Sequence, residues 1–257
     1  MKVTILGCGA SAGVPVIACD CEVCSSENPK NKRSRASILV EENGANILID
    51  ASTDFRMQAL THKIAKVDGV LFTHEHADHV HGIDDLRIYN CQSSDNIDIY
   101  GLQDTIDNIK SRFSYAFDDL GHVYKYKPAF KANVIEEFKA FNIDSVEISA
   151  FPQDHTNVIT AGYRIGDFAY STDLKRLSQE SLDFLKGIKV WVVDCQDYVE
   201  IPTHSHLEQT LKWIEEVNPD RAILTHMSHK IDYDEILSML PKNIVPGFDG
   251  MVIDKII

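Results

Sequence analysis

Residues 70–79, Val70-Leu71-Phe72-Thr73-His74-Glu75-His76-Ala77-Asp78-His79, decide how the rest of the chain is interpreted. The stretch begins as a short apolar run typical of a buried strand, and then gives three histidines and two carboxylates within seven residues. Such side chains must be paired when they are buried, and zinc, manganese or iron is a suitable partner for imidazole with carboxylate. The zinc-protease pattern H-E-x-x-H is excluded because Asp78 stands where the pattern requires a second histidine. We therefore expect His74 and His76 to face one metal, and Asp78 and His79, on the next turn, to face a second.

The size and composition of the chain are those of a large globular unit. Its 257 residues, 44% of them hydrophobic, can bury a sizeable core, and we expect residues 1–257 to form a single domain with two β-rich halves. The start of the chain is too short an apolar run for a signal peptide, and no stretch of about 18 apolar residues is present to span a membrane. We therefore expect a cytoplasmic protein without a membrane partner, whose six cysteines are metal ligands or buried thiols rather than disulfides.

The charge of the chain bears on its partners. The net charge is −14, which opposes non-specific binding to nucleic acid and favours small substrates. One basic run, Lys30-Asn31-Lys32-Arg33-Ser34-Arg35, departs from this balance. Its default interpretation is a solvated loop, and the alternative is that it attracts a phosphate-bearing substrate.

A second cluster of candidate metal ligands lies in Cys19-Asp20-Cys21-Glu22-Val23-Cys24. Three cysteines within six residues, in a reducing compartment, indicate a zinc site that lacks only its fourth ligand. The preceding Gly7-Cys8-Gly9-Ala10-Ser11-Ala12-Gly13-Val14-Pro15 lacks the Gly-Lys-Ser/Thr ending of a phosphate-binding P-loop. We interpret it as a tight turn that lets backbone approach the site closely.

Hydrophobic periodicity and turn signals divide the rest of the chain into strands and helices. Strands are expected at 2–7, 36–40, 46–49, 97–100, 146–151, 161–165, 168–171, 190–193, 222–224 and 251–253. Helices are expected at 53–65, with Thr53 as the N-cap, and at 84–91, 103–117, 178–186, 207–217 and 232–240. The stretch 118–140 gives no clear assignment. Two β-rich halves with strand-to-helix connections are consistent with two facing sheets covered by helices.

Three further side chains of metal-binding type, His155, Asp173 and His226, follow expected strands. Each lies one to four residues past an apolar run, as the central motif does. Taken singly, each is readily explained as a satisfied polar residue. Together they suggest one site, because functional side chains commonly converge from the same ends of neighbouring strands. Asp50 ends another strand and can orient a metal-bound histidine from behind.

The pattern His-x-His-x-Asp-His after an apolar strand resembles the signature of the metallo-β-lactamase-fold hydrolases. The resemblance implies an α/β (α+β) fold, a four-layer αββα sandwich, with two divalent ions, zinc or manganese, in the active site. The ligands carried over are, for the first metal, His74, His76 and His155, for the second, Asp78, His79 and His226, and for the bridge between them, Asp173. Diiron oxidoreductases of the same fold carry Glu at position 76, so His76 favours a hydrolase.

The late segment Leu224-Thr225-His226-Met227-Ser228-His229 carries a second histidine that has no place in the two-metal site. His229 supplies the ligand that Cys19, Cys21 and Cys24 lack, which gives one closed structural zinc site. This Cys₃His arrangement resembles the PhnP family of phosphonate-pathway cyclic phosphodiesterases, and the resemblance covers nearly the whole chain. Relatives in pyrroloquinoline-quinone biosynthesis are similar in the same respect, so the arrangement marks a subgroup more than a substrate.

The resemblance also implies a catalytic role for His204, and Asp78 is expected to be the second catalytic residue. Two metals lower the pKa of a bridging water, so that a metal-bound hydroxide can attack phosphorus. His204 would act as general acid and protonate the leaving alkoxide. We therefore expect a metal-dependent phosphodiesterase that acts on a small, cyclic phosphodiester, and a homodimer is compatible with this interpretation.

Rival functions stay open. The tRNA 3′-processing nucleases resemble this motif set, but the chain lacks a long Gly/Pro-rich insertion of the kind they use to grip tRNA, and its acidic charge disfavours a nucleic-acid partner. A thioesterase or lactonase is less well supported, because the Cys₃His site is not characteristic of those enzymes. From a different class, the alternative is an iron-dependent oxidoreductase similar to the pyrroloquinoline-quinone biosynthesis relatives.

Overall fold

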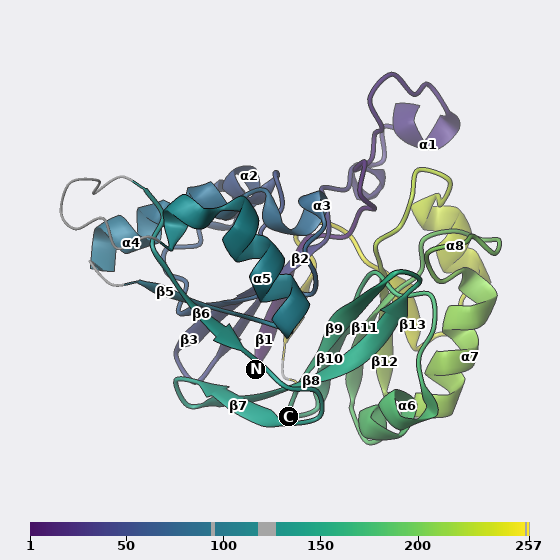
Figure 1. Cartoon of the computed structure of the whole chain (residues 1–257). Coiled ribbons are helices and arrows are strands. Elements are labelled where there is room, and N and C mark those ends of the chain that lie inside the picture. Colours follow the sequence, from purple (N-terminus) through teal and green to yellow (C-terminus); the bar gives the residue numbers. More distant parts are fainter. Residues whose placement is uncertain (94–95, 118–126, 255, 257) are drawn as a thin grey trace.

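Two sheets of seven strands face each other in the computed structural model, which describes residues 1–93, 96–117, 127–254 and 256 (Figure 1). The first sheet has the order β14 (Val252–Asp254), β1 (Lys2–Gly7), β2 (Ser37–Glu42), β3 (Ala45–Ile49), β4 (Gly69–Leu71), β5 (Ile97–Gly101) and β6 (Phe130–Val134). The second has the order β13 (Ile244–Pro246), β12 (Arg221–Thr225), β11 (Val190–Asp194), β10 (Phe168–Ser171), β9 (Val158–Ile165), β8 (Val146–His155) and β7 (Ala140–Ile143).

The two sheets repeat one plan. In the first, β1, β2 and β3 pair antiparallel, and β3 to β6 pair parallel. In the second, β8, β9 and β10 pair antiparallel, and β10 to β13 pair parallel. Because parallel strands end on the same edge of a sheet, each half brings several strand ends to one edge.

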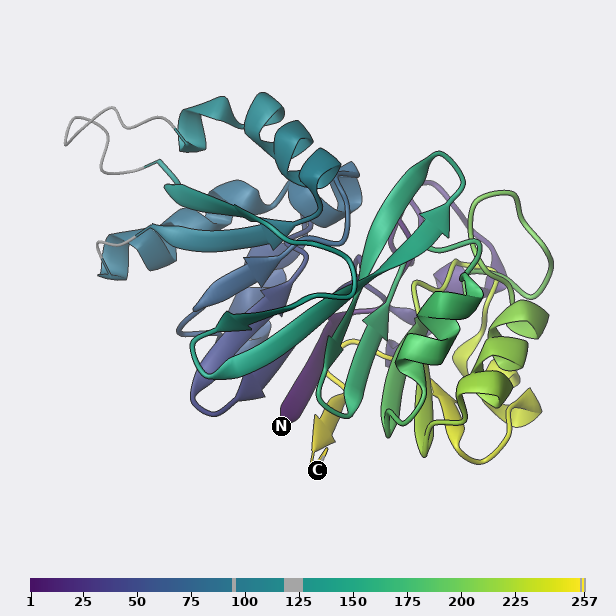
Figure 2. The same cartoon turned by 60° about the horizontal axis from the view of Figure 1, so that its bottom comes forward.

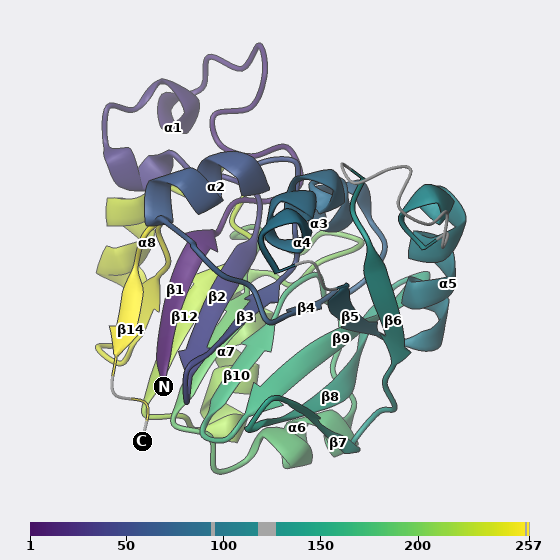
Figure 3. The same cartoon turned by 90° about the vertical axis from the view of Figure 1, so that its left-hand side faces the viewer.

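Helices cover the outer face of each sheet, which gives the four layers expected from the sequence (Figures 1 and 2). The first sheet is covered by α2 (Phe55–His62), α3 (Ala77–Val80), α4 (Arg87–Ser93) and α5 (Gln103–Arg112), together with the 3₁₀ turns η2 (Ile83–Leu86) and η3 (Ser114–Ala116). The second is covered by α6 (Gln179–Leu185), α7 (Leu207–Val217) and α8 (Tyr233–Met239). The short α1 (Glu22–Ser25), followed by the 3₁₀ turn η1 (Pro29–Asn31), stands out beyond these layers (Figure 3).

Alternation along the strands shows how the layers are held together. In β3, Ile47 and Ile49 belong to the core shared with the second sheet, whereas Leu48 packs among the residues beneath the outer helices. Each face of the sheet therefore buries apolar side chains, as expected for strands covered on both sides. The hairpin between β2 and β3 turns at Asn43 and Gly44, whose positive φ values of 50° and 85° suit a tight two-residue connection.

Several boundaries differ from the sequence-based expectation. The helix expected at 53–65 spans only Phe55–His62, because Lys63 adopts a left-handed conformation that ends it, and its N-cap is Asp54 instead of Thr53. The helix expected at 103–117 ends at Arg112 and is followed by η3. The strand expected at 146–151 continues to His155, because its last residues pair with the start of β9.

Three strands were not expected at all. Of these, β6 falls within the unassigned stretch 118–140, whose residues 118–126 lie outside the described residues, and β7 begins at the last residue of that stretch and continues to Ile143. The third, β13, contains Pro246 and has only three residues. Within the described residues, none of the helices combines the length and the apolar character that crossing a bilayer requires.

Candidate metal centre

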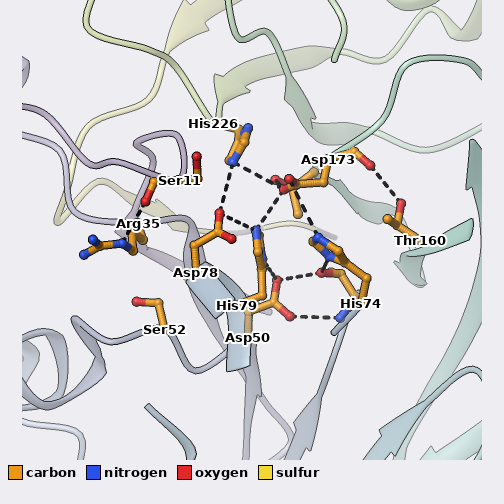
Figure 4. Close-up of polar contacts among 12 residues, drawn as sticks. Ser11, Arg35, Asp50, Ser52, His74, Asp78, His79, Thr160, Asp173 and His226 are labelled. Carbon is orange, nitrogen blue, oxygen red and sulfur yellow. Dashed lines mark hydrogen bonds and ion pairs between the residues drawn. The ribbon is translucent and has the colours of Figure 1, made fainter. Parts of the chain in front are cut away.

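Four strand ends in the two facing sheets carry the candidate ligands of the central site. His74 follows β4 in the first sheet, and His155 is the last residue of β8 in the second. Asp173 lies two residues after β10, and His226 directly follows β12. Figure 4 shows the side chains of His74, Asp173 and His226 turned toward one another, with Asp78 and His79 of α3 beside them.

The side chains form two groups that share one carboxylate. The ligand atoms of His74, His76 and His155 make one group, and those of Asp78, His79, Asp173 and His226 make the other, with all atoms of a group within 4.8 Å of one another. Asp173 lies between the groups. Its Oδ1 is 3.9 Å from Nε2 of both His74 and His155, and its Oδ2 is 3.0 Å from Nε2 of His79 and 3.4 Å from Nε2 of His226.

This geometry fits a pair of metal ions. Two ligands of a tetrahedral ion with bonds near 2.1 Å lie about 3.4 Å apart, which is the range of the separations around Asp173. Within the described residues, the Nε2 atoms of His74, His79 and His226 are buried and make no hydrogen bond. Each of these nitrogens lies 3.0–3.9 Å from a carboxylate oxygen of Asp173, and a metal ion between them would satisfy both groups.

The backbone is strained at two of these ligands and at Asp50, which contacts a third. Asp50, Asp173 and His226 have φ values of 63°, 53° and 57°, in the left-handed region that non-glycine residues rarely adopt. Such conformations cost about 1–3 kcal/mol each and persist when the surrounding structure fixes them. Each of the three residues directly follows a strand or stands two residues past one, so the turn aims its side chain toward the centre.

Buried hydrogen bonds orient the ligands from behind. Asp50 Oδ2 lies 2.7 Å from Nδ1 of His79, which leaves Nε2 directed at the centre, as the sequence led us to expect for Asp50. Main-chain N–H and hydroxyl of Thr73 donate to the same carboxylate, both at 2.9 Å. Nδ1 of His155 lies 2.8 Å from the carbonyl oxygen of Thr203.

Without a metal, protonated histidines offset the negative charge of the buried carboxylates. Burial would raise the pKa of Asp173, but the imidazoles of His226 and His79 outweigh burial and hold that pKa well below its usual range. Burial would lower the pKa of His226, but Asp173 and Asp78 raise it to about 9. Metal binding therefore has to displace a proton from His226, which makes metal affinity fall as the pH falls.

His204 lies on the loop before α7, with its ring against the central cluster. The ring centroid is 4.6 Å from that of His155 and 4.9 Å from that of His226. Its Nδ1 is 3.4 Å from Asp194 Oδ2 and 3.9 Å from Asp173 Oδ1. The residue is only 9% exposed, so it is less free than its loop position suggests, because the two imidazoles and Asp194 enclose it.

Asp194 is a residue of the site for which the sequence suggested no role. It ends β11 and is fully buried, and its Oδ2 faces both Nδ1 of His204 and, at 3.6 Å, Nδ1 of His226. The hydroxyl of Ser205 donates to its Oδ1 at 3.0 Å. The signal in the sequence is a carboxylate directly after the apolar run Val190–Val193, the same arrangement that singled out Asp50.

The expected Cys₃His cluster is also brought together. The Sγ atoms of Cys19 and Cys21 each lie 3.4 Å from Nδ1 of His229, and the four ligand atoms, including Sγ of Cys24, are all within 4.8 Å of one another. Sulfur and nitrogen ligands of a tetrahedral zinc ion are about 3.5 Å apart. The residues therefore fit a closed zinc site, and unlike the central cluster it is only partly buried.

The basic run is not the solvated loop that its composition suggested. Arg33 is 1% exposed, and its guanidinium donates to the carbonyl oxygens of Ser228 and Ile231 at 3.1 and 2.7 Å. It is buried because those partners, 195 and 198 residues away in sequence, form the loop that carries His229.

The glycine-rich segment joins the two clusters. Main-chain N–H of Met227 donates to the carbonyl of Cys8 at 2.9 Å, and that of Ala10 donates to the carbonyl of Met227 at 3.1 Å. A Cβ on Gly9 would lie 2.8 Å from the carbonyl oxygen of Arg33, so this turn requires glycine. The tight turn expected here thus holds the segment 226–229, which carries one ligand of each cluster.

A protein-family model and a curated protein each match most of this chain. A family model described as the β-lactamase superfamily domain matches residues 45–227. A protein named octanoyltransferase from Porphyromonas gingivalis is 35% identical over an alignment of 260 positions that covers 99% of this chain. The chain spans 52% of the length of that protein.

Two solved structures share the fold over nearly the whole chain. A crystal structure described as a new diphosphatase from the PhnP family has a TM-score of 0.90 and 31% identity, and covers 98% of this chain and 96% of its own. The structure of Zn²⁺-bound PqqB from Methylobacterium extorquens has a TM-score of 0.81, covers 99% of this chain and 100% of its own, and is 19% identical. At that identity the second likeness shows the fold alone.

Proposed function

Since the chain belongs to the β-lactamase superfamily, we propose that it is a metal-dependent phosphodiesterase that hydrolyses a small, cyclic phosphodiester. The observation that carries the proposal is Asp173, whose two carboxylate oxygens face separate groups of histidines across the same centre. The similarity to a PhnP-family diphosphatase supports phosphorus as the atom attacked.

The residues that would hold the two metals are those of the two groups already described. His74, His76 and His155 would hold the first ion, Asp78, His79 and His226 would hold the second, and Asp173 would contact both. When bound, such a pair supplies Lewis acidity and a water-derived nucleophile near neutral pH. Zinc or manganese fits this donor set of imidazole and carboxylate.

Residues of the protein itself orient the metal ligands and would supply a proton. Asp50 and Thr73 fix the ring of His79, so that little reorganisation is needed during the reaction. His204 is the proposed general acid, because its ring borders the centre and it is not needed to complete either group of ligands. Asp194, with Oδ2 3.4 Å from Nδ1 of His204, would accept a hydrogen bond from Nδ1–H and so orient the ring, and the proton transferred would be the second proton of the imidazolium, on Nε2.

The test is a panel of cyclic diesters, linear diesters and monoesters, assayed with zinc, manganese and iron in turn. We expect turnover of diesters with zinc or manganese, and poor turnover of monoesters, since a monoester dianion brings extra charge and lacks a second ester arm to anchor it. Efficient monoester turnover without diester turnover would contradict the proposal.

Further measurements separate the rival functions. Iron in the purified protein together with oxygen uptake would favour an oxidoreductase similar to PqqB. Cleavage of tRNA precursors in preference to small diesters would favour a 3′-processing nuclease.

A further inference from the structure

The His204 loop, residues 195–206, joins β11 to α7 and is held against the metal centre by its own carbonyl groups. Three consecutive carbonyl oxygens of this loop accept hydrogen bonds from side chains outside it: that of Ile201 from Lys175 at 2.6 Å, that of Pro202 from Thr156 at 3.4 Å, and that of Thr203 from His155 at 2.8 Å. The donors lie on the two turns that carry His155 and Asp173. The backbone just before His204 is therefore joined directly to the turns that present two of the metal ligands.

Lys175 differs from the other two donors because it brings a charged group out of water. The residue is 9% exposed and lies two positions after Asp173. Besides the carbonyl oxygen of Ile201, its Nζ contacts Oε1 of Glu200 at 3.0 Å, but the side chain of Glu200 is 73% exposed. An ammonium group that leaves water needs such partners, and an ion pair with an exposed carboxylate contributes little. The carbonyl of Ile201 is thus the partner that Lys175 holds in place.

The rest of the His204 loop is fixed only at its base. Main-chain N–H of Gln196 donates to the carbonyl of Ser205 at 3.2 Å, and that of Leu207 donates to the carbonyl of Asp197 at 3.0 Å. Beyond these bonds the loop runs over the surface, where Val199 is 62% exposed. The position of the main chain on the near side of His204 therefore depends on the three carbonyl contacts, and Lys175 makes the shortest of them.

We propose that Lys175 is a positioning residue for proton donation by His204. By holding the carbonyl of Ile201, it keeps the ring of His204 at the distance from the centre at which Nε2–H can pass its proton to the leaving oxygen as the P–O bond breaks. The inference rests on the proposed function and deepens it, because it links the turn of the bridging Asp173 to the general acid. A misplacement of about 1 Å in such a group can cost about 10²-fold in rate.

The test uses Lys175→Met, which removes the donor but keeps a long side chain, on two substrates that differ in their need for a proton. We expect kcat on an alkyl or cyclic diester to fall by about 10- to 100-fold, and kcat on a nitrophenyl diester to fall much less, because its leaving phenolate needs little protonation. KM and metal content should stay the same. If Lys175 only contributed positive charge near the centre, its loss would raise KM for both diesters alike.

Three further variants separate positioning from a structural ion pair. Lys175→Arg keeps charged donors and should recover most of the rate on the alkyl diester. Glu200→Gln removes the carboxylate but leaves the bond to Ile201, so it should resemble wild type. Lys175→Gln, for the case that methionine prevents folding, is too short to reach Ile201 and should behave as described for Lys175→Met. A rate loss in Glu200→Gln equal to that of Lys175→Met would overturn the assignment.

A double variant shows whether Lys175 acts through His204. Residues that work through one group have non-additive effects, so Lys175→Met combined with His204→Ala should be no slower on the alkyl diester than His204→Ala alone. If the two losses multiply, Lys175 acts on the metal-bearing turn independently of His204, and the proposal is wrong.

A measurement without substrate distinguishes failure of this inference from failure of the proposed function. Diethyl pyrocarbonate modifies accessible imidazoles, and mass spectrometry of the metal-loaded protein reports His204, with the exposed His81 as internal reference. We expect His204 to react about 10-fold faster in Lys175→Met than in wild type, since a hydrogen bond to a charged group no longer opposes opening of the loop, and His81 to react equally in both. Equal labelling of His204 would overturn the positioning role. Faster labelling together with turnover of neither diester would count against the phosphodiesterase alone.

Discussion

The central cluster draws its side chains from strand ends in both sheets, whereas the Cys₃His cluster takes three of its four residues from one short loop. In the centre, His74, His79, Asp173 and His226 are almost completely buried. In the other cluster, Cys19, Cys21 and His229 are partly exposed.

From this difference we expect metal binding to matter in a different way for each cluster. The sheets, the strained turns and buried partners such as Asp50 and Asp194 hold the central side chains in place without a metal. The loop around α1 has a small cluster of its own, of Val14, Val23 and Cys24, so a metal there would supply much of its order. We therefore expect variants of the centre to lose activity and variants of the loop to lose stability.

The largest effect is expected for Asp173→Asn. The substitution removes the charge that both groups of histidines face, so both central metals should bind weakly, and activity should fall by about 10⁴-fold or more as several kcal/mol of transition-state stabilisation is lost. Metal analysis should still find zinc at the Cys₃His site, and far-UV circular dichroism should be unchanged. Retention of two central metals with normal turnover would refute the bridging role.

Next is His204→Ala, which tests the side chain that borders the centre. A general acid typically contributes about 10²–10⁴-fold, and most of this is needed when the leaving group is a basic alkoxide. We expect a loss in that range on an alkyl or cyclic diester, a distinctly smaller loss on a nitrophenyl diester, and unchanged metal content. Equal losses on both substrates would indicate binding or charge stabilisation instead of proton donation.

Asp194→Asn should have a smaller effect, because its carboxylate acts only through the rings of His204 and His226. Loss of such a partner behind a metal ligand typically costs about 10- to 100-fold in activity or metal affinity. Ser205→Ala removes the hydroxyl that holds the same carboxylate and is the milder control. No change in either activity or metal affinity in Asp194→Asn would remove Asp194 from the site.

In the loop cluster, Cys21→Ser should lower stability more than activity. It should remove one zinc ion per chain and lower the melting temperature by about 5–10 °C, as expected when a ligand at 100 times its Kd no longer stabilises a chain of this size. Cys91→Ser, a change outside both clusters, serves as the control. An unchanged zinc content would show that the Cys₃His assignment is wrong.

The smallest effect concerns pH. The main-chain N–H of Cys24 and the ring of His229 lower the pKa of the Cys21 thiol to about 6, while burial raises the pKa of the Cys24 thiol to about 11. Because the pKa of Cys21 is lowered, its thiolate stabilises the folded loop above the unfolded value near 9, and that contribution is lost as the pH falls through about 6. In zinc-stripped protein, alkylation followed by mass spectrometry should modify Cys21 with a midpoint near pH 6 and Cys24 hardly at all at pH 8. Equal rates at the two cysteines would contradict these environments.

The sequence was most informative where a motif follows an apolar strand. The run before His74 predicted both a buried strand and the start of a site, and the same pattern located His155, Asp173 and His226. The two facing sheets with helices outside them were expected and are confirmed. That these side chains bind metal is still a prediction, which metal analysis of wild type and Asp173→Asn tests.

What the sequence did not reveal depends on partners that are distant along the chain. Arg33 is buried by carbonyl groups almost 200 residues away, and no local pattern distinguishes it from its exposed neighbour Lys32. The strand β13 is short and contains a proline, so it lacks the periodicity that would indicate it. Asp194 follows an apolar strand as Asp50 does, but its role depends on His204 and His226, which lie 10 and 32 residues further along the chain.

One feature of the segment 226–229 bears on the order in which the protein is assembled. During synthesis the chain emerges from its N-terminus, so Cys19, Cys21 and Cys24 appear early, and the side chains of residues 74–79 follow. His226 and His229, only three residues apart, are the last members of the two clusters to appear. A nascent chain can therefore complete neither cluster until β12 has been made, and then it can complete both almost at once. Completion of both candidate metal sites is therefore tied to the synthesis of the one segment 226–229.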